Sequence, residues 1–249
     1  MNIKYEEQKS NNLFNLNTYF DKIYVLNLDH RVDRMNKMIL KLKKNNITNY
    51  IRFPAINGTT EPYYSQWYNI KKIRQFGFLE TPGSYGVLLS AYFILNHATQ
   101  NNYQSILILE DDVIFHYNFE NLFSSKISTI PQNWKLLYLG SSMHQWRVAQ
   151  RCRRFENYLV PQGSIPGAFA LGIKRVCFPI LIRSIMKLSS PWDMAPLKAI
   201  NQMFPGECYV LYPNLIIADT RDSDIREPKS LEEKKRSCGW NLDNYDWEA

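Results

Sequence analysis

The sequence predicts an α/β domain whose central sheet is mostly parallel and flanked by helices. Short apolar runs alternate with segments of helical periodicity, which is the order expected of βαβ units. One run, Ser105–Leu109 (SILIL), is apolar almost throughout, as is typical of a central strand buried on both faces. The length of 249 residues suits one domain. We expect a flexible segment at residues 1–18 and a single domain at residues 19–249.

The first strand is expected at Lys22–Leu28 (KIYVLNL), which is short and rich in β-branched and aromatic residues. Asp29 is expected to cap the helix that follows this strand. Apolar residues recur in that helix at helical spacing: Met35, Met38, Ile39 and Leu42. A strand, a turn and an amphipathic helix in this order predict the opening of a βαβ unit.

Further elements follow along the chain. A second strand is expected at Asn49–Pro54, with a turn at Asn57-Gly58, whereas residues 59–80 lack a clear period and predict an irregular insertion or short helices. Thr81 is suited to cap a long apolar helix that has Pro82 in its first turn. Later strands are expected at Trp134–Leu139, at Gly167–Leu171 (followed by a helical run to Leu188) and at Tyr209–Ala218, interrupted near Pro213.

Three adjacent acids, Glu110, Asp111 and Asp112, directly follow the buried run SILIL. Their mutual repulsion is costly unless a cation or solvent relieves it, and ligands of open α/β sheets bind beyond the carboxyl ends of the strands. In an extended segment, Glu110 and Asp112 point to one side and Asp111 to the other. Two carboxylates on one side suit Mg²⁺ or Mn²⁺. The alternative is an acidic turn that faces water.

The starts of two helices are candidate ligand sites. Asn27, Arg31 and Arg34 surround the first one, where backbone amides and arginine side chains can bind phosphate. Gly83 and Ser84 begin the second, where a glycine permits close approach of the backbone to a ligand. Either could instead be an ordinary helix start with solvated side chains.

Acids in later loops could also take part in chemistry. Asp193 follows Trp192, which could form a platform for a sugar, and a loop carboxylate can act as a general base where the site raises its pKa. A turn or N-cap aspartate is the simpler interpretation of Asp193. Asp219, Asp222 and Asp224 follow the last strand, where one of them could complete a metal site or pair with a nearby arginine.

The net charge of +7 is compatible with nucleic acid or with an anionic small molecule, such as a diphosphate, as a partner. The basic residues are scattered in KLKKNN, KKIR, RCRR and EEKKR, which argues against nucleic acid.

Four widely spaced cysteines predict free thiols rather than a zinc site. Neither a secretory signal nor a membrane span is evident, so we expect a soluble cytoplasmic protein.

Several segments give the sequence a resemblance to family 25 glycosyltransferases, which include bacterial lipooligosaccharide galactosyltransferases and procollagen galactosyltransferase domains. The segments follow the family's order from about residue 22 to residue 226: IYVLNLDHRVDR, FPAING, TPGSYGVLLSAY, SILILEDDVIF, LLYLG, GAFALGIKR, SSPWDMA and YPNLIIADTRDSDIR. The resemblance implies a GT-A-type fold, a UDP-sugar donor, a divalent cation (usually manganese) and inversion at the anomeric carbon.

The resemblance also implies roles for individual residues. It places the family's acidic metal motif at Glu110-Asp111-Asp112, the nucleotide-binding strand and helix at Asn27, Leu28 and Arg34, an acceptor-side aspartate at Asp193, and a C-terminal SDI element at Ser223-Asp224-Ile225. Many members carry a Ser-His pair where this chain has Ser90-Ala91, so a role for that imidazole is absent or replaced.

The residues and the resemblance together give one expected site. Its members are Asp112, Glu110 and Asp219 as ligands of Mn²⁺ or Mg²⁺; Asn27, Leu28, Arg31, Arg34, Gly83, Ser84, Glu110 and Asp111 as contacts of the UDP-sugar; and Asp193 and Asp224 as catalytic carboxylates, with Asp193 as the expected base. The expected reaction moves a hexose (galactose, glucose or N-acetylglucosamine) to a hydroxyl of a glycan or a collagen-like protein.

Two other functions stay open at this stage. A nucleotidyltransferase acting on sugar phosphates would use similar acids, but it normally needs a basic, glycine-rich loop after the first strand, and none is evident here. The other alternative is a noncatalytic basic module that binds nucleic acid.

Overall fold

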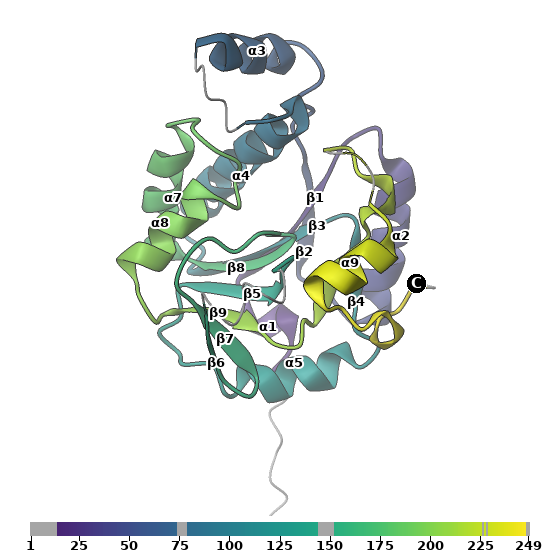
Figure 1. The fold of residues 1–249 in the computed structure, drawn as a ribbon. Helices are drawn as coiled ribbons and strands as arrows, with labels where there is room; N and C mark the ends of the chain where they lie inside the picture. The colour runs from purple at the N-terminus through teal and green to yellow at the C-terminus, as the bar shows by residue number, and fades with distance from the viewer. Residues whose placement is uncertain (1–13, 74–78, 144–151, 226, 228, 248–249) are drawn as a thin grey trace, which may run out of the picture.

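A large sheet between two layers of helices forms the body of the protein (Figure 1). The computed structural model describes residues 14–73, 79–143, 152–225, 227 and 229–247. In this part of the chain the main sheet has eight strands in the order β2-β1-β3-β8-β5-β9-β7-β6. The strands are β1 Lys22–Asn27, β2 Tyr50–Pro54, β3 Ser105–Glu110, β5 Leu136–Gly140, β6 Cys152–Arg154, β7 Tyr158–Pro161, β8 Ala170–Lys174 and β9 Cys208–Leu211.

Most strands of this sheet run in the same direction. β1 is parallel to both β2 and β3, and β5 is parallel to β9. β8 and β7 run against their neighbours. The expected α/β class, with a mostly parallel sheet flanked by helices, is therefore confirmed.

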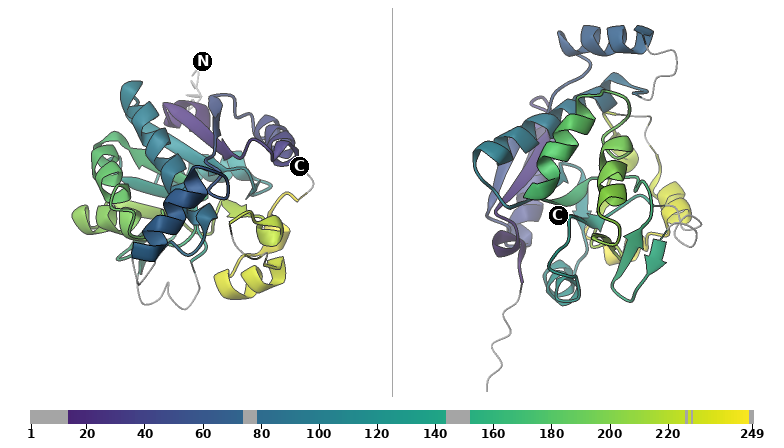
Figure 2. Two further views of the ribbon diagram at one scale, coloured as in Figure 1. Left: turned by 90° about the horizontal axis from the view of Figure 1, so that it is seen from above. Right: turned by 90° about the vertical axis from the view of Figure 1, so that its left-hand side faces the viewer.

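Helices cover both faces of the sheet (Figure 2). They are α1 Leu16–Tyr19, α2 Val32–Lys44, α3 Tyr63–Ile73, α4 Pro82–Gln100, α5 Phe119–Ile127, α7 Phe178–Ile185, α8 Ala195–Met203 and α9 Leu231–Cys238, with short 3₁₀ turns at Arg175–Cys177, Thr220–Asp222 and Leu242–Asn244. α3 extends beyond the end of α4, apart from the body of the domain. None of the helices in the described ranges is long and apolar enough to cross a membrane.

The alternation of side chains along β1 divides the core into two clusters. Ile23 and Val25 lie on the face covered by α2 and α5, and Tyr24 lies on the opposite face with α4, α7 and α8. Burial on both faces explains why the strand sequences are almost continuously apolar. All four cysteines are free thiols, as expected.

The topology brings the ends of three strands to one edge of the sheet. In the parallel register, Leu26 of β1 lies beside Glu110 of β3, and Asn27 lies beside Pro54 of β2. After Glu110 the chain enters β4 (Val113–Phe115), which pairs with β10 (Ile216–Ala218) in a separate two-stranded sheet. The loops after β1, β2, β3 and β10 therefore meet at this edge.

Most expected elements are present, with local differences. Thr81 caps α4, since its side chain accepts a hydrogen bond from the Ser84 amide. The prediction that Asp29 caps α2 is wrong, because α2 begins after Arg31 without a side-chain cap and Asp29 forms an ion pair with Arg52. The expected strand at 209–218 divides into β9 and β10, which belong to different sheets. Of the expected flexible segment at residues 1–18, residues 1–13 lie outside the described residues, and Leu16–Tyr19 forms α1.

Candidate active site

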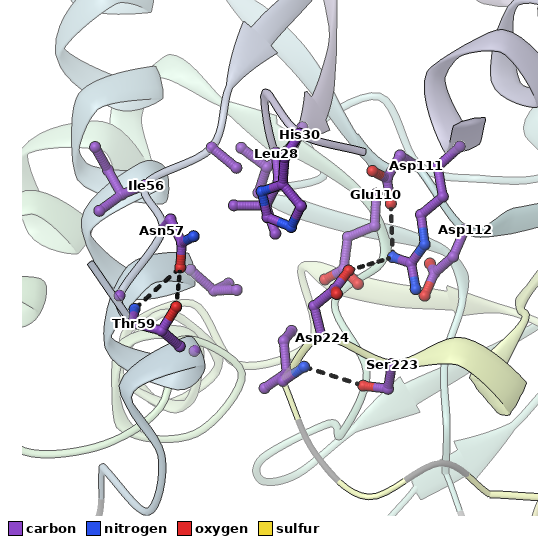
Figure 3. Close-up of a pocket in the computed structure, with 17 residues that line it drawn as sticks. Leu28, His30, Ile56, Asn57, Thr59, Glu110, Asp111, Asp112, Ser223 and Asp224 are labelled. Carbon is purple, nitrogen blue, oxygen red and sulfur yellow. Dashed lines mark hydrogen bonds and ion pairs between the residues drawn. The ribbon is translucent and has the colours of Figure 1, made fainter. Parts of the chain in front are cut away.

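Two cavities meet at the acidic triplet. The first, which we call the β1 cavity, has a volume of about 220 Å³ and is lined by loops after β1 and β2 (Figure 3). The second, the α9 cavity, has a volume of about 330 Å³ and is lined by loops after β7 and α7 and by α9. The residues that line both cavities are Val87, Glu110, Asp112, Ser223 and Ile225. Two triplet carboxylates thus stand at the junction of the cavities.

The triplet side chains point in different directions, but the expected extended backbone is wrong, because Asp111 and Asp112 form a turn between β3 and β4. Glu110 and Asp112 line both cavities, whereas Asp111 lines only the β1 cavity. The Asp111 carboxylate turns toward β1 and α2, where it accepts hydrogen bonds from Asn27 Nδ2 (2.6 Å) and Arg34 Nη1 (3.0 Å). Asp111 therefore points away from Glu110 and Asp112 as expected, but this separation arises in a turn and not from the alternation of an extended strand.

Two polar atoms in this region are buried without a hydrogen-bond partner among the described residues. Oδ1 of Asp112 and Nη2 of Arg34 are buried, and neither has a hydrogen-bond partner among the residues that the structure describes. Orphaned buried polar atoms are rare in folded proteins because desolvation of such groups is costly. A cation would satisfy the carboxylate oxygen and an anionic oxygen would satisfy the guanidinium. The residues present therefore fit a divalent cation together with a phosphate.

The electrostatics of the triplet favour a cation as well. Burial, followed by the charges of Asp112 and Asp111, raises the pKa of Glu110 well above its usual range. Burial also raises the pKa of Asp112 to about 7, although the charge of Arg34 opposes this shift. Crowded acids that resist ionisation are stabilised in their charged form by a bound cation. Over the described ranges, no three His, Cys, Asp or Glu side chains are grouped so as to hold a metal ion, so other ligands would have to supplement these carboxylates.

Asp219 lies beside the triplet through its backbone. Its amide donates a hydrogen bond to the Asp112 carbonyl (2.8 Å), which continues the β4–β10 pairing. Its carboxylate is bound by Arg221 Nε (2.8 Å) and Nη2 (2.7 Å). Asp219 could reach a metal only by exchanging this ion pair, and its role as a ligand stays a prediction.

The remaining residues expected to contact the nucleotide take different positions. Leu28 and Gly83 line the β1 cavity, and Ser84 lines the α9 cavity. Asn27 lines neither; it is buried, and it orients Asp111 and accepts a hydrogen bond from Arg52 Nε. Arg31 also lines neither cavity, because its guanidinium is bound by three carboxylates.

The two expected catalytic carboxylates lie on different sides of the triplet. Asp193 lines the α9 cavity, where its Oδ2 accepts a hydrogen bond from the Gly167 amide (3.0 Å). Trp192 beside it is only 5% exposed, so it offers little surface as a sugar platform. Asp224 lines the β1 cavity and forms ion pairs with Arg31 (2.6 Å) and Arg34 (3.4 Å).

Ala91, which stands where many family members have a histidine, belongs to the hydrophobic core. Ala91 is buried in the cluster around α4 and lines neither cavity. Ser90 accepts a hydrogen bond from the Ile56 amide (2.8 Å) and donates one to the Gly86 carbonyl (2.7 Å), so it fastens the loop after β2 to α4.

Sequence reasoning missed several residues of the site. His30, Asn57 and Thr59 line the β1 cavity, with Asn57 and Thr59 on the side away from the triplet (Figure 3). Because β2 is parallel to β1, the strand-end rule that singled out Glu110 could also have found Asn57.

Lys41, near the triplet, was also missed by the sequence analysis. It is buried in α2, its Nζ donates to the Val113 carbonyl (2.9 Å), and its position on a helix face carries no signal in the sequence.

Comparison with known proteins gives consistent matches. The family model described as "Glycosyltransferase family 25 (LPS biosynthesis protein)" matches residues 20–167. Human procollagen galactosyltransferase 2 is 26% identical over 147 residues, which are 53% of this chain and 22% of that protein. A "Glycosyltransferase 25 family member" of Aedes aegypti is 28% identical over 137 residues, 47% of this chain and 21% of that protein. The match thus spans about a fifth of the length of these relatives.

Solved structures with a related chain path include a glycosyltransferase "involved in the glycosylation of the major capsid of PBCV-1". It has a TM-score of 0.43 and 15% identity, and the match covers 76% of this chain and 80% of that chain. Mouse xyloside xylosyltransferase 1 has a TM-score of 0.39 and 11% identity, with 76% of this chain and 71% of that chain covered.

Proposed function

Because the chain belongs to glycosyltransferase family 25, we propose that it is a metal-dependent, inverting hexosyltransferase that uses a UDP-sugar as donor. The observation that carries this proposal is the placement of Glu110 and Asp112 where two cavities meet. A transfer reaction needs one binding site for the donor and another for the acceptor, with the reacting atoms at their junction.

The β1 cavity is the proposed donor site. It contains Leu28 at the carboxyl end of β1, together with Arg34, whose Nη2 has no partner in the described ranges and is suited to a diphosphate oxygen. Nη1 of Arg34 is held by Asp111 and Asp224, so the guanidinium could bind a phosphate through Nη2 without losing either contact.

Asp112 and Glu110 are the proposed ligands of the cation, with Asp219 as the third candidate. Bound there, Mn²⁺ or Mg²⁺ would neutralise charge that develops on the leaving diphosphate. Arg34 would stabilise the same charge from the side of α2. A preorganised arginine and a cation on one side of the donor favour departure of UDP toward that side.

The α9 cavity is the proposed acceptor site, and Asp193 is the proposed general base. Inversion requires the acceptor hydroxyl to attack from the side opposite the leaving group, and Asp193 lies on the cavity that Arg34 does not line. The hydrogen bond from Gly167 fixes one carboxylate oxygen and leaves the other to accept a proton. Asp224 fits this role less well, since two arginines neutralise it.

The acceptor class follows from the relatives by analogy. Matched proteins are named procollagen galactosyltransferases, and the family description refers to LPS biosynthesis. We therefore propose a hydroxyl on a glycan or on a collagen-like protein as the acceptor and galactose, glucose or N-acetylglucosamine as the sugar.

The experiment that tests this proposal is a panel of UDP-sugars incubated with the protein and manganese, with UDP release as the measurement. We expect release of UDP from at least one UDP-hexose and its loss on chelation of the metal. Consumption of UTP with a sugar phosphate, and pyrophosphate release, would indicate a nucleotidyltransferase instead. Salt-sensitive binding to DNA or RNA with no UDP release would support the nucleic-acid-binding alternative.

A further inference from the structure

Arg31 is saturated by protein carboxylates. Its side chain is 12% exposed and forms ion pairs with Asp33 (3.1 Å), with Asp224 (2.6 Å) and with Asp222. Asp33 lies in the first turn of α2, directly after Arg31, which is the N-cap residue of this helix. Asp222 and Asp224 come from a segment about 190 residues later in the chain. A guanidinium with this many anionic contacts connects two segments of the protein rather than serving as a free phosphate ligand. We call the ion pairs of Arg31 with Asp222 and Asp224 the Arg31 tie.

The segment tied by Arg31 forms a wall shared by the cavities. Ser223 and Ile225 line both cavities, and Asp224 between them lines the β1 cavity. The amide of Ile225 donates a hydrogen bond to Ser223 Oγ (3.2 Å), which gives the segment a local turn. Its position therefore affects the shape of both proposed substrate sites.

Gly83 shows how closely this wall packs on α4. A Cβ atom added at Gly83 would lie 3.0 Å from the Ile225 Cα and 3.1 Å from the Asp224 carbonyl oxygen. α4 thus supports the segment from one side by close backbone contact, and Arg31, the N-cap residue of α2, supports it from another. The two supports are independent of each other, since one is steric and the other ionic.

We propose that Arg31 is a positioning residue that holds Asp222–Ile225 in place as the partition between donor and acceptor cavities, and that it does not bind the nucleotide. The functional part of this proposal rests on the proposed glycosyl transfer. Arg34 is the arginine assigned to the diphosphate, because it lines the β1 cavity and its Nη2 has no partner among the residues that the structure describes. Arg31, the N-cap residue of α2, and Arg34, in its first turn, thus have different main roles, although Arg34 also lies 3.4 Å from Asp224 and 3.8 Å from Asp222.

The test compares Arg31→Gln with Arg31→Lys and Asp222→Asn. Asp222 is a useful probe because its side chain is 72% exposed and lines neither cavity, and because its longer ion pair with Arg34 Nε (3.8 Å) is weaker than its contact with Arg31. Arg175→Gln is the matched control, since Arg175 binds Asn102 near the opposite end of β3. The measurements are hydrogen–deuterium exchange of peptides covering residues 219–225, the Kd of UDP with manganese, and kcat and KM for hydrolysis of UDP-galactose or of another UDP-hexose that the wild type cleaves.

We expect Arg31→Gln to speed exchange in this segment by about tenfold, because local opening costs less once the tie is removed. The Kd of UDP and the donor KM should stay within about threefold, while kcat falls about tenfold because the sugar is less well positioned. Asp222→Asn should act in the same direction but more weakly, Arg31→Lys should recover part of the loss, and Arg175→Gln should change none of these. The effects of Arg31→Gln and Asp222→Asn on exchange should be non-additive, since the residues share a contact.

Two results would overturn the proposal. Unchanged exchange at residues 219–225 in Arg31→Gln would show that the tie does not hold the segment. A rise of about tenfold or more in the Kd of UDP, without faster exchange, would instead make Arg31 a nucleotide ligand. If the wild-type protein binds no UDP at all, the proposed function fails, but the exchange measurement still decides whether Arg31 holds the partition.

Discussion

At the scale of single residues, neighbouring acids in the triplet have different surroundings. Asp111 forms an ion pair with Arg34 and accepts a hydrogen bond from the amide of Asn27, so its charge is compensated within the protein. Asp112 has a raised pKa and a buried oxygen that has no hydrogen-bond partner within the described part of the chain. The same type of side chain therefore serves as a structural anion at one position and as a candidate cation ligand at the next.

The raised pKa of Asp112 predicts how stability varies with pH in the absence of metal. The folded protein holds a proton on Asp112 up to about pH 7, whereas the unfolded chain releases it near the ordinary value of 3.8. Unfolding then releases a proton, so the free energy of unfolding falls as the pH rises between these two values. Melting temperatures of the metal-free protein from pH 4 to pH 8 should show this decline.

The matched variant is Asp112→Asn, which should flatten the decline and leave only the part due to Glu110. Saturating manganese should reverse the trend, because the cation binds the ionised carboxylate and stabilises the folded state. A metal-free wild type whose melting temperature rises through this pH range would contradict the assignment of Asp112.

Removal of the proposed base gives a second residue-level prediction. Asp193→Asn should reduce the rate of transfer by about two orders of magnitude or more, because the proton acceptor is lost, and should leave UDP affinity unchanged. The amide oxygen of asparagine can still accept the Gly167 hydrogen bond, so the loop geometry is retained. Steady-state kinetics and calorimetry with UDP measure the two quantities.

Asp224→Asn is the comparison for this base assignment. Asp224 pairs with Arg31 and Arg34 on the donor side, so we expect its loss to weaken UDP binding more than Asp193→Asn does. If Asp224→Asn abolishes transfer with UDP affinity intact, while Asp193→Asn keeps its rate, then Asp224 is the base.

At the scale of elements, the wall of the β1 cavity depends on close packing between the loop after β2 and α4. A Cβ atom at Gly58 would lie 1.7 Å from the Pro82 carbonyl oxygen, and one at Gly86 would lie 2.3 Å from the Ile56 carbonyl oxygen. Ser90 adds the hydrogen bond to the Ile56 amide. The backbones can approach this closely only because both positions lack a side chain.

Gly58→Ala should therefore lower the free energy of unfolding by about 1–3 kcal/mol, as expected where an added methyl group forces the backbone apart. Gly163→Ala is the matched control, since no atom of the described residues lies within 4 Å of a Cβ atom there, and its effect should stay within about 0.5 kcal/mol. Chemical denaturation measures both. Equal effects of the two substitutions would show that the close approach at Gly58 is not required.

The sequence predicted elements whose signal is local. β3 was evident because its side chains are apolar on both faces, and Thr81-Pro82 marked the start of α4 by capping chemistry. The false cap at Asp29 arose because Arg52, 23 residues later, competes for its carboxylate. Contacts of this kind depend on how the strands assemble, which no local pattern records.

The candidate site, like the secondary structure, was predictable only where the signal is local in the sequence. Glu110 and Asp112 were found because a strand end and a run of acids coincide in the sequence. The ion pairs of Arg31 with Asp222 and Asp224 were not predicted, because they join residues that are 191 and 193 positions apart in the sequence. The buried Lys41 escaped as well, since lysine on a helix is normally a solvated residue.

At the scale of the whole molecule, the order of the strands explains why the acids and the arginines meet. β1 lies between β2 and β3, so the loops after all three converge, and the β4–β10 pair returns the C-terminal segment to the same edge. Segments from the beginning, middle and end of the chain therefore build the two cavities. The central claim is that one metal at their junction links donor binding to Asp112.

Titration of UDP with and without manganese tests that claim most directly. Calorimetry of the wild type should show UDP binding that manganese strengthens by tenfold or more, about 1.4 kcal/mol or more of binding free energy. In Asp112→Asn, manganese should have little effect on UDP binding, while Asp111→Asn should retain more of the effect because that side chain faces Asn27 and Arg34. Full manganese dependence of UDP binding in Asp112→Asn would contradict the account.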